Sequence, residues 1–366
     1  MEYIKQLDSL RAIAVILVII SHWFSKSHFL NHFPNGAIGV DMFFVLSGFL
    51  ITSILFQNRT IPNVTRGEIL KVFYARRTLR IFPIYYLTIF ILLAFSEHTG
   101  TSIKSDFLYY FTYTSNFNFL IKGRWDGMLS HLWSLAVEEQ FYLIWPWLII
   151  FTKKKHLIYI ITLFILVGLS SRLIFNDFPL SRILTTSCFD SFGIGALLSW
   201  FIHFKEKRLK MFYSISMVFS LILISLVIYG NFAFSIHYWT IIPSSTANSI
   251  ISIWLITYIY INRKSNKTIF RFFLDSPILI FLGKISYGIY LYHNIIPRLT
   301  AIIKNTHVMK SSETFNLLLD LPYFMLIFNS VLLVIISWGS FKIIELPFLN
   351  FKKKFNLKKE PNIGYT

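Results

Sequence analysis

The sequence predicts an all-α integral membrane protein, a bundle of about ten transmembrane helices with both the N-terminus and the C-terminus in the cytoplasm. Hydrophobic residues make up 55% of the 366 residues and charged residues only 14%, which is typical of polytopic membrane proteins. Apolar stretches long enough to cross about 30 Å of hydrocarbon recur along the chain. The loops between them are alternately richer and poorer in Lys and Arg, and the richer loops are expected in the cytoplasm.

Ten stretches are long enough for a helix, and they lie near residues 10–28, 37–56, 79–96, 131–151, 156–175, 188–204, 211–229, 238–261, 276–296 and 322–345. The basic segments are the N-terminus, 57–80, 153–155, 205–210, 262–275 and the C-terminal tail. Every second loop is therefore basic, and an even number of helices returns the chain to the cytoplasmic side. Helix one has an Arg inside its start and no small-residue cleavage site before Trp23, so we expect it to remain in the mature protein.

The net charge of +18 is spread over separate loops, which argues against nucleic-acid binding. We expect these residues, including Lys352 in the basic cytoplasmic tail 351–366, to set topology and contact anionic membrane lipids. We expect residues 1–350 to form the membrane domain.

A single cysteine, Cys188, excludes an internal disulfide, and no histidine spacing predicts a metal site. The aromatic outer loop 97–130 either lies in the membrane interface or stacks on sugar rings.

Helix one carries two ionisable residues, Arg11 and His22. An eleven-residue step is about three helical turns, so the two side chains share a face and lie about 16 Å apart. Because charges inside a membrane helix are costly, the pair predicts the two ends of a polar track. Asp41 lies near the outer start of helix two, with Ser47 deeper.

Helix three begins with three arginines, Arg76, Arg77 and Arg80. Arginine offers a two-pronged donor that suits phosphate, so the cluster resembles an anion site. The alternative is a positive anchor at the cytoplasmic face.

Helix four places Ser134, Glu138 and Tyr142 on one face, whereas Glu139 points about 100° away. By depth, Glu138 lies at the level of His22, where a carboxylate orients an imidazole or shares its proton. A structural carboxylate bonded to a neighbouring helix is the alternative.

Helix nine brings Tyr290 and His293 toward the outer side. His293 belongs either to the same cleft or to the membrane interface.

Seven segments in register then resemble acyltransferase family 3, the bacterial integral-membrane O-acyltransferases that modify cell-surface glycans. They are Arg11 with His22, GVDMFFVLSGFLIT (39–52), ARRTLRIFPIYY (75–86), WSLAVEEQFYLIWP (133–146), FDSFGIGALLSW (189–200), ISYGIYLYH (285–293) and IIELP (343–347).

The resemblance implies transfer of an acyl group, usually acetyl, from cytoplasmic acetyl-CoA to a hydroxyl of a cell-surface glycan or glycan intermediate, in the bacterial inner membrane. It implies a catalytic base or acyl relay at His22, paired with Arg11, and a CoA end at the three arginines. We accordingly expect catalytic roles for His22, Arg11, Glu138 and Ser134, donor binding by Arg76, Arg77, Arg80 and Tyr142, and substrate binding by Asp41, Glu139, Tyr290 and His293.

Some members of the family carry a fused extracytoplasmic hydrolase-like domain, which we expect this protein to lack, with separate polysaccharide assembly proteins as possible partners. A transporter or flippase for a glycan or lipid-linked intermediate is the rival function, although no internal repeat favours it. A third reading is an acyltransferase-like sensor or scaffold. The sequence leaves open the acceptor and whether the acyl group is acetyl, succinyl or longer. It also leaves open direct or covalent two-step transfer, and the oligomeric state.

Overall fold

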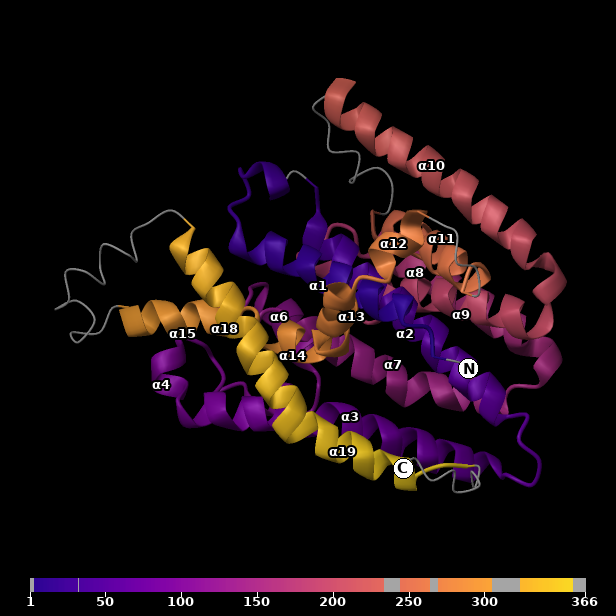
Figure 1. Cartoon of the computed structure of the whole chain (residues 1–366), viewed down its shortest axis with the longest axis horizontal. Coiled ribbons are helices and arrows are strands. Elements are labelled where there is room, and N and C mark those ends of the chain that lie inside the picture. The colour runs from indigo at the N-terminus through magenta and orange to yellow at the C-terminus, as the bar shows by residue number, and fades with distance from the viewer. Residues whose placement is uncertain (1–2, 32, 234–243, 264–268, 305–322, 358–366) are drawn as a thin grey trace.

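The computed structural model describes residues 3–31, 33–233, 244–263, 269–304 and 323–357, and all regular structure in these ranges is helical (Figure 1). Each of the ten predicted ranges contains a helix. Nine of these ranges hold a single main helix: α1 Gln6–Trp23, α2 Asn35–Asn58, α3 Arg66–Ala94, α7 Leu132–Phe151, α8 Leu157–Ile174, α9 Phe189–Phe204, α10 Leu209–Ala233, α11 Ser244–Ile261 and α18 Phe324–Ser340. Residues 238–243 and 322 of the predicted ranges lie outside the described residues.

Six helical segments of the described chain are long and apolar enough to cross a membrane. They are Gln6–Trp23, Asn35–Asn58, Arg66–Ala94, Lys154–Ile174, Glu206–Leu226 and Phe324–Lys354. Helix α7, whose polar residues include two glutamates that lower its hydropathy, and α9, with only 16 residues, do not belong to this group. The last span extends beyond residue 350, because α18 continues through a π-helical turn, Phe341–Glu345, into α19, Leu346–Phe351, and a final 3-10 turn, Lys352–Lys354.

The ninth predicted helix is wrong as a single element. The chain forms α13, Pro277–Lys284, then α14, Ser286–Tyr292, and then α15, Ile295–Lys304. Ile285 caps both α13 and α14 with a backbone near φ −97° and ψ 9°, which interrupts the regular helical hydrogen bonding. The break places α14 beside α18 and α1 as a short separate helix.

Helices α2 and α9 pack closely against each other in the centre of the molecule. A Cβ added to Gly48 of α2 would lie 2.1 Å from Phe192 O, and one added to Gly195 of α9 would lie 2.1 Å from Val45 O. Only glycine allows the two backbones to meet at this distance. Helix α10 lies along one side of the molecule next to α11 (Figure 1).

Three short helices fold the 97–130 loop: α4 Ser96–Thr99, α5 Phe107–Phe111 and α6 Ser115–Lys122. Asp106 is buried and pairs with Lys122, and Asn118 Nδ2 donates to it at 3.0 Å. Burial opposes ionisation of Asp106, but these hydrogen bonds and the Lys122 charge outweigh it and hold the pKa of Asp106 below its usual value. Among the loop aromatics, Tyr110 is buried in the core whereas Trp125 is exposed, so only part of the loop is available to a membrane or a sugar.

Candidate active site

A cavity of about 430 Å³ lies between α1, α2, α3, α7 and α14. Helix α2 lines it from Val40 to Ile54, which is about 21 Å along the helix axis at 1.5 Å per residue. The cavity is therefore elongated. About half of its lining residues are aliphatic or phenylalanine, and the others carry charges or hydroxyl groups.

Arginines from two helices line this cavity. Arg11 Nη1 forms an ion pair with Asp8 Oδ1 at 2.6 Å. The Arg77 guanidinium lies over the ring of Tyr142, 5.4 Å from its centroid, and Arg80 follows one turn later on α3. Within the described chain, neither Arg77 nor Arg80 forms an ion pair with a carboxylate.

Arg76 differs from the other two arginines. It does not line the cavity, and its Nη1 instead donates to Asn356 Oδ1 at 3.0 Å. The three arginines of the predicted cluster therefore face two directions, because successive residues on a helix are rotated by about 100°.

The α7 residues meet α2 in a hydroxyl–carboxylate cluster. Ser47 and Tyr142 both donate a hydrogen bond to Glu138 Oε1, and their own oxygens lie 3.1 Å apart. Ser134, Glu138 and Tyr142 all line the cavity, as their helical spacing predicts. Glu139 also lines it, and its carboxylate forms no hydrogen bond with a described residue.

His22 does not pair with Glu138, so that prediction is wrong. Its Nδ1 lies 2.9 Å from Asn294 Oδ1, and its exposed ring is outside the lining of the cavity. Two side chains at the same depth on different helices need not be neighbours. The junction between α14 and α15 lies next to the end of α1, and its Asn294 is the hydrogen-bond partner of His22.

Three histidine rings form a row beside the cavity. The His22 and His293 centroids are 5.0 Å apart, and those of His293 and His131 are 4.8 Å apart. His293 Nδ1 lies 2.6 Å from Tyr290 O, and because a carbonyl only accepts, this nitrogen carries the hydrogen. His293 Nε2 is buried with no hydrogen-bond partner in the described chain.

Tyr290 and Ser134 lie between the cavity and the histidines. Their hydroxyls are hydrogen-bonded to each other, and Ser134 Oγ also donates to His131 O at 3.0 Å. Tyr290 lines the cavity, while its ring centroid is 5.4 Å from that of His293. The cavity and the histidine row therefore share one wall.

Sequence reasoning missed His131 and Asn294. His131 directly precedes α7, three residues before Ser134, and Asn294 follows His293. Their positions next to residues already selected were the available signal. Within the described residues, no group of three or more His, Cys, Asp or Glu side chains is arranged to hold a metal ion.

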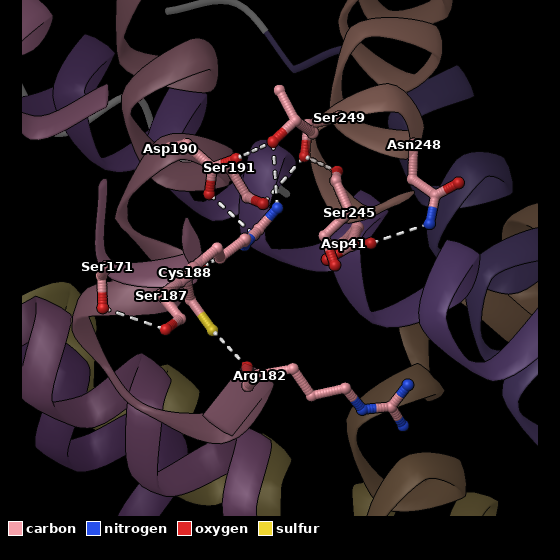
Figure 2. A network of polar contacts seen from close by, with 12 residues as sticks. Asp41, Ser171, Arg182, Ser187, Cys188, Asp190, Ser191, Ser245, Asn248 and Ser249 are labelled. Atoms are coloured by element: carbon pink, nitrogen blue, oxygen red, sulfur yellow. Dashed lines mark hydrogen bonds and ion pairs between the residues drawn. The ribbon is translucent and has the colours of Figure 1, made fainter. Parts of the chain in front are cut away.

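Asp41 lies outside the cavity, contrary to its expected place in the substrate site. Asn248 Nδ2 donates to Asp41 Oδ2 at 2.8 Å, in a buried polar network between α2, α8, α9 and α11 (Figure 2). The same network holds the ion pair between Arg172 Nη2 and Asp190 Oδ1, at 2.7 Å. Asp41 therefore contributes to helix packing, because the α2 face that carries it turns toward α11.

Residues 4–339 match the model of the acyltransferase domain that defines acyltransferase family 3. The chain belongs to this family. Its match to acyltransferase family 3 covers α1 through α18, and thus every element that lines the cavity or supplies a histidine.

Relatives in acyltransferase family 3 bear names that agree with the match. The chain is 40% identical over 165 residues to the peptidoglycan O-acetyltransferase OatA of Listeria monocytogenes, covering 42% of this chain and 25% of OatA. It is 28% identical over 373 residues to a putative O-acetyltransferase of Staphylococcus aureus, covering 95% of this chain and 58% of that protein. It is also 39% identical over 156 residues to the putative peptidoglycan O-acetyltransferase YrhL of Bacillus subtilis, covering 40% and 23%. The chain thus spans less than two thirds of the length of these relatives, and no solved structure matches it.

Proposed function

We propose that this protein is a membrane O-acetyltransferase that moves an acetyl group from acetyl-CoA to a hydroxyl of a cell-surface glycan. The observation that carries the proposal is the elongated cavity, which has arginines along part of its wall and Tyr290, next to the histidine row, along another part. Such a cavity suits a long donor with a charged head and a reactive tail.

The donor is proposed to lie along α2. Arg77 and Arg80 bind phosphate groups of CoA, since guanidinium groups form paired hydrogen bonds with phosphate oxygens. The pantetheine arm follows the apolar wall between Val40 and Ile54, whose length of about 21 Å suits an extended chain. We propose that the arginine side is cytoplasmic, with both termini on that side of the bacterial inner membrane.

The acetyl group is proposed to react next to His22. Because Asn294 Oδ1 accepts from His22 Nδ1, the neutral ring keeps its lone pair on Nε2. This nitrogen removes the proton from the glycan hydroxyl as the hydroxyl oxygen attacks the thioester carbon. The carbon–sulfur bond then breaks, and the CoA thiolate takes the proton back from His22. General base catalysis of this kind contributes about 10²- to 10⁴-fold.

The acceptor class follows from the relatives. Two of them are named for peptidoglycan O-acetylation, so we propose a peptidoglycan-type sugar as the acceptor. His22 is exposed, whereas His131 and His293 are buried, and a large glycan therefore has access only to His22 among the three.

The test measures labelled acetyl transfer from acetyl-CoA to glycan in membranes that contain the wild-type protein, His22→Ala or His28→Ala. His28 is half-buried, packs against Phe24 and Phe29, accepts a hydrogen bond from Leu30 N and lies outside the cavity and the histidine row, so it serves as the control. We expect transfer with the wild type and His28→Ala and a loss of about 100-fold or more with His22→Ala. Full transfer by His22→Ala would refute the role of His22. Absence of transfer by the wild type with several acyl donors and glycans would favour a transporter.

A further inference from the structure

The C-terminal segment packs against the arginine-bearing part of α3. Helix α19 and the final turn Lys352–Lys354 contact α3, and α19 lies alongside α3 in Figure 1. The hydrogen bond between Arg76 Nη1 and Asn356 Oδ1 ties the residues beyond this turn to the same helix. The segment is therefore part of the folded domain.

The three consecutive lysines of the final turn have different surroundings. Lys353 and Lys354 are exposed, and Lys354 Nζ lies 4.9 Å from the centroid of the Phe351 ring. Lys352 is half-buried and lies within electrostatic reach of Arg76, Arg77 and Arg80. Lys352 is thus the lysine of this α3-contacting turn that interacts with the arginines, whereas Lys353 and Lys354 are exposed.

The cluster has an excess of positive charge. Among the described residues, none of its four cations is within 4.0 Å of a carboxylate oxygen. Glu138 and Glu139, which line the cavity, interact electrostatically with Arg77, and the buried Glu345 interacts electrostatically with Arg80. Like charges gathered without ion pairs repel one another, and a bound anion removes this cost.

We propose that Lys352 binds a phosphate group of the donor nucleotide together with Arg77 and Arg80, while Arg76, which does not line the cavity, holds the C-terminal segment through Asn356. The inference deepens the proposed function, because it takes CoA as the ligand of this site. Arg77 and Arg80 belong to both the cation cluster and the cavity wall, so an anion at the cluster is continuous with a chain that lies in the cavity. The headgroup of an anionic lipid has the same chemistry, but a single lipid phosphate does not explain that continuity.

The experiment compares the wild type, Lys352→Gln, Lys352→Arg and Lys353→Gln, each purified in nanodiscs of phosphatidylcholine. Calorimetry measures binding of CoA and of pantetheine, which lacks the nucleotide phosphates. We expect Lys352→Gln to weaken CoA binding about tenfold and to leave pantetheine binding unchanged, because one charged hydrogen bond is lost. Lys353→Gln is expected to bind CoA as the wild type does, and Lys352→Arg to retain most of the affinity.

Three outcomes would contradict the inference. Equal CoA affinity of Lys352→Gln and the wild type would remove Lys352 from the site while leaving the proposed function intact. An equal loss for CoA and pantetheine would show that the substitution only disturbs the fold. Stabilisation of the wild type over Lys352→Gln in phosphatidylglycerol nanodiscs, with unchanged CoA affinity, would assign the lysine to lipid. Failure of the wild type to bind CoA would instead contradict the proposed function itself.

Discussion

Substitution of Gly283 by alanine tests how the contact between α1 and α13 supports the cavity. An added Cβ would lie 1.9 Å from Asp8 O, whereas ordinary contact begins at 3.4 Å, so the two backbones must separate by about 1.5 Å. Overpacking of this kind costs about 1–3 kcal/mol. Asp8 is also the ion-pair partner of Arg11 in the cavity wall, and a shift of about 1 Å near a reacting group lowers rates by up to about 100-fold.

The matched control is Gly339→Ala. Gly283 is the last residue but one of α13, and Gly339 lies in α18 just before the π-helical turn, but a Cβ at Gly339 meets no atom within 4 Å. Both substitutions gain up to about 1 kcal/mol of helix propensity, so their difference isolates the clash. We expect Gly283→Ala to lower both the apparent unfolding temperature and acetyl transfer, and Gly339→Ala to lower neither.

The assay combines thermal unfolding of the purified protein with acetyl transfer in membranes. If Gly283→Ala and Gly339→Ala unfolded at the same temperature and transferred acetyl at the same rate, the close packing of Gly283 on Asp8 would be refuted. A lower unfolding temperature with full transfer would refute only the link from Asp8 to the site.

Two further predictions concern the histidine row and the outer loop. Asn294→Ala should lower acetyl transfer about tenfold, because the hydrogen bond that selects the His22 tautomer is lost. Asn294→Asp should move the acid limb of the pH–rate profile to higher pH, since a carboxylate favours protonated His22. An unchanged profile in both variants would contradict the pairing of His22 with Asn294. The pKa of Asp106 is lowered in the folded protein, so its contribution to stability is present above about pH 3.9 and is lost as the pH falls further. The unfolding temperature of Asp106→Asn should therefore depend less on pH in that acidic range than the unfolding temperature of the wild type. Equal pH dependence of the two proteins would count against the Lys122 ion pair.

The positions of the helices could be predicted from the sequence, because hydrophobicity over about twenty residues depends on local composition. Whether each range forms one continuous helix could not be predicted, because the ninth range, 276–296, contains separate helices. Gly283 and Lys284 are residue types common at helix ends, but neither excludes a continuous helix over the apolar run 276–296. The break at Ile285 depends on how α14 packs against α18 and α1, which are distant in sequence.

The sequence predicted which candidate residues share one face of a helix, but it did not predict the contacts between helices. Helical periodicity placed Ser134, Glu138 and Tyr142 on one face, since that relation belongs to a single helix. It did not identify the partner of His22, because partners on different helices depend on the rotation of each helix and on which helices are neighbours. The structure supplies Asn294 in place of Glu138 for this reason.

The shortness of α14 makes the position of its residues in the candidate active site depend on contacts with other helices. A helix of seven residues has few internal hydrogen bonds, so packing determines its position. A Cβ added to Gly288 of α14 would lie 3.4 Å from both Cα and Cβ of the buried Ser337 in α18, an ordinary contact distance, so the space between the two helices is about one methyl group wide. Because Tyr290 and His293 follow within the next two turns, a larger side chain at Ser337 would displace the cavity wall and the histidine row together. Sequence variation in α18 can thus adjust the site without altering any residue that lines it.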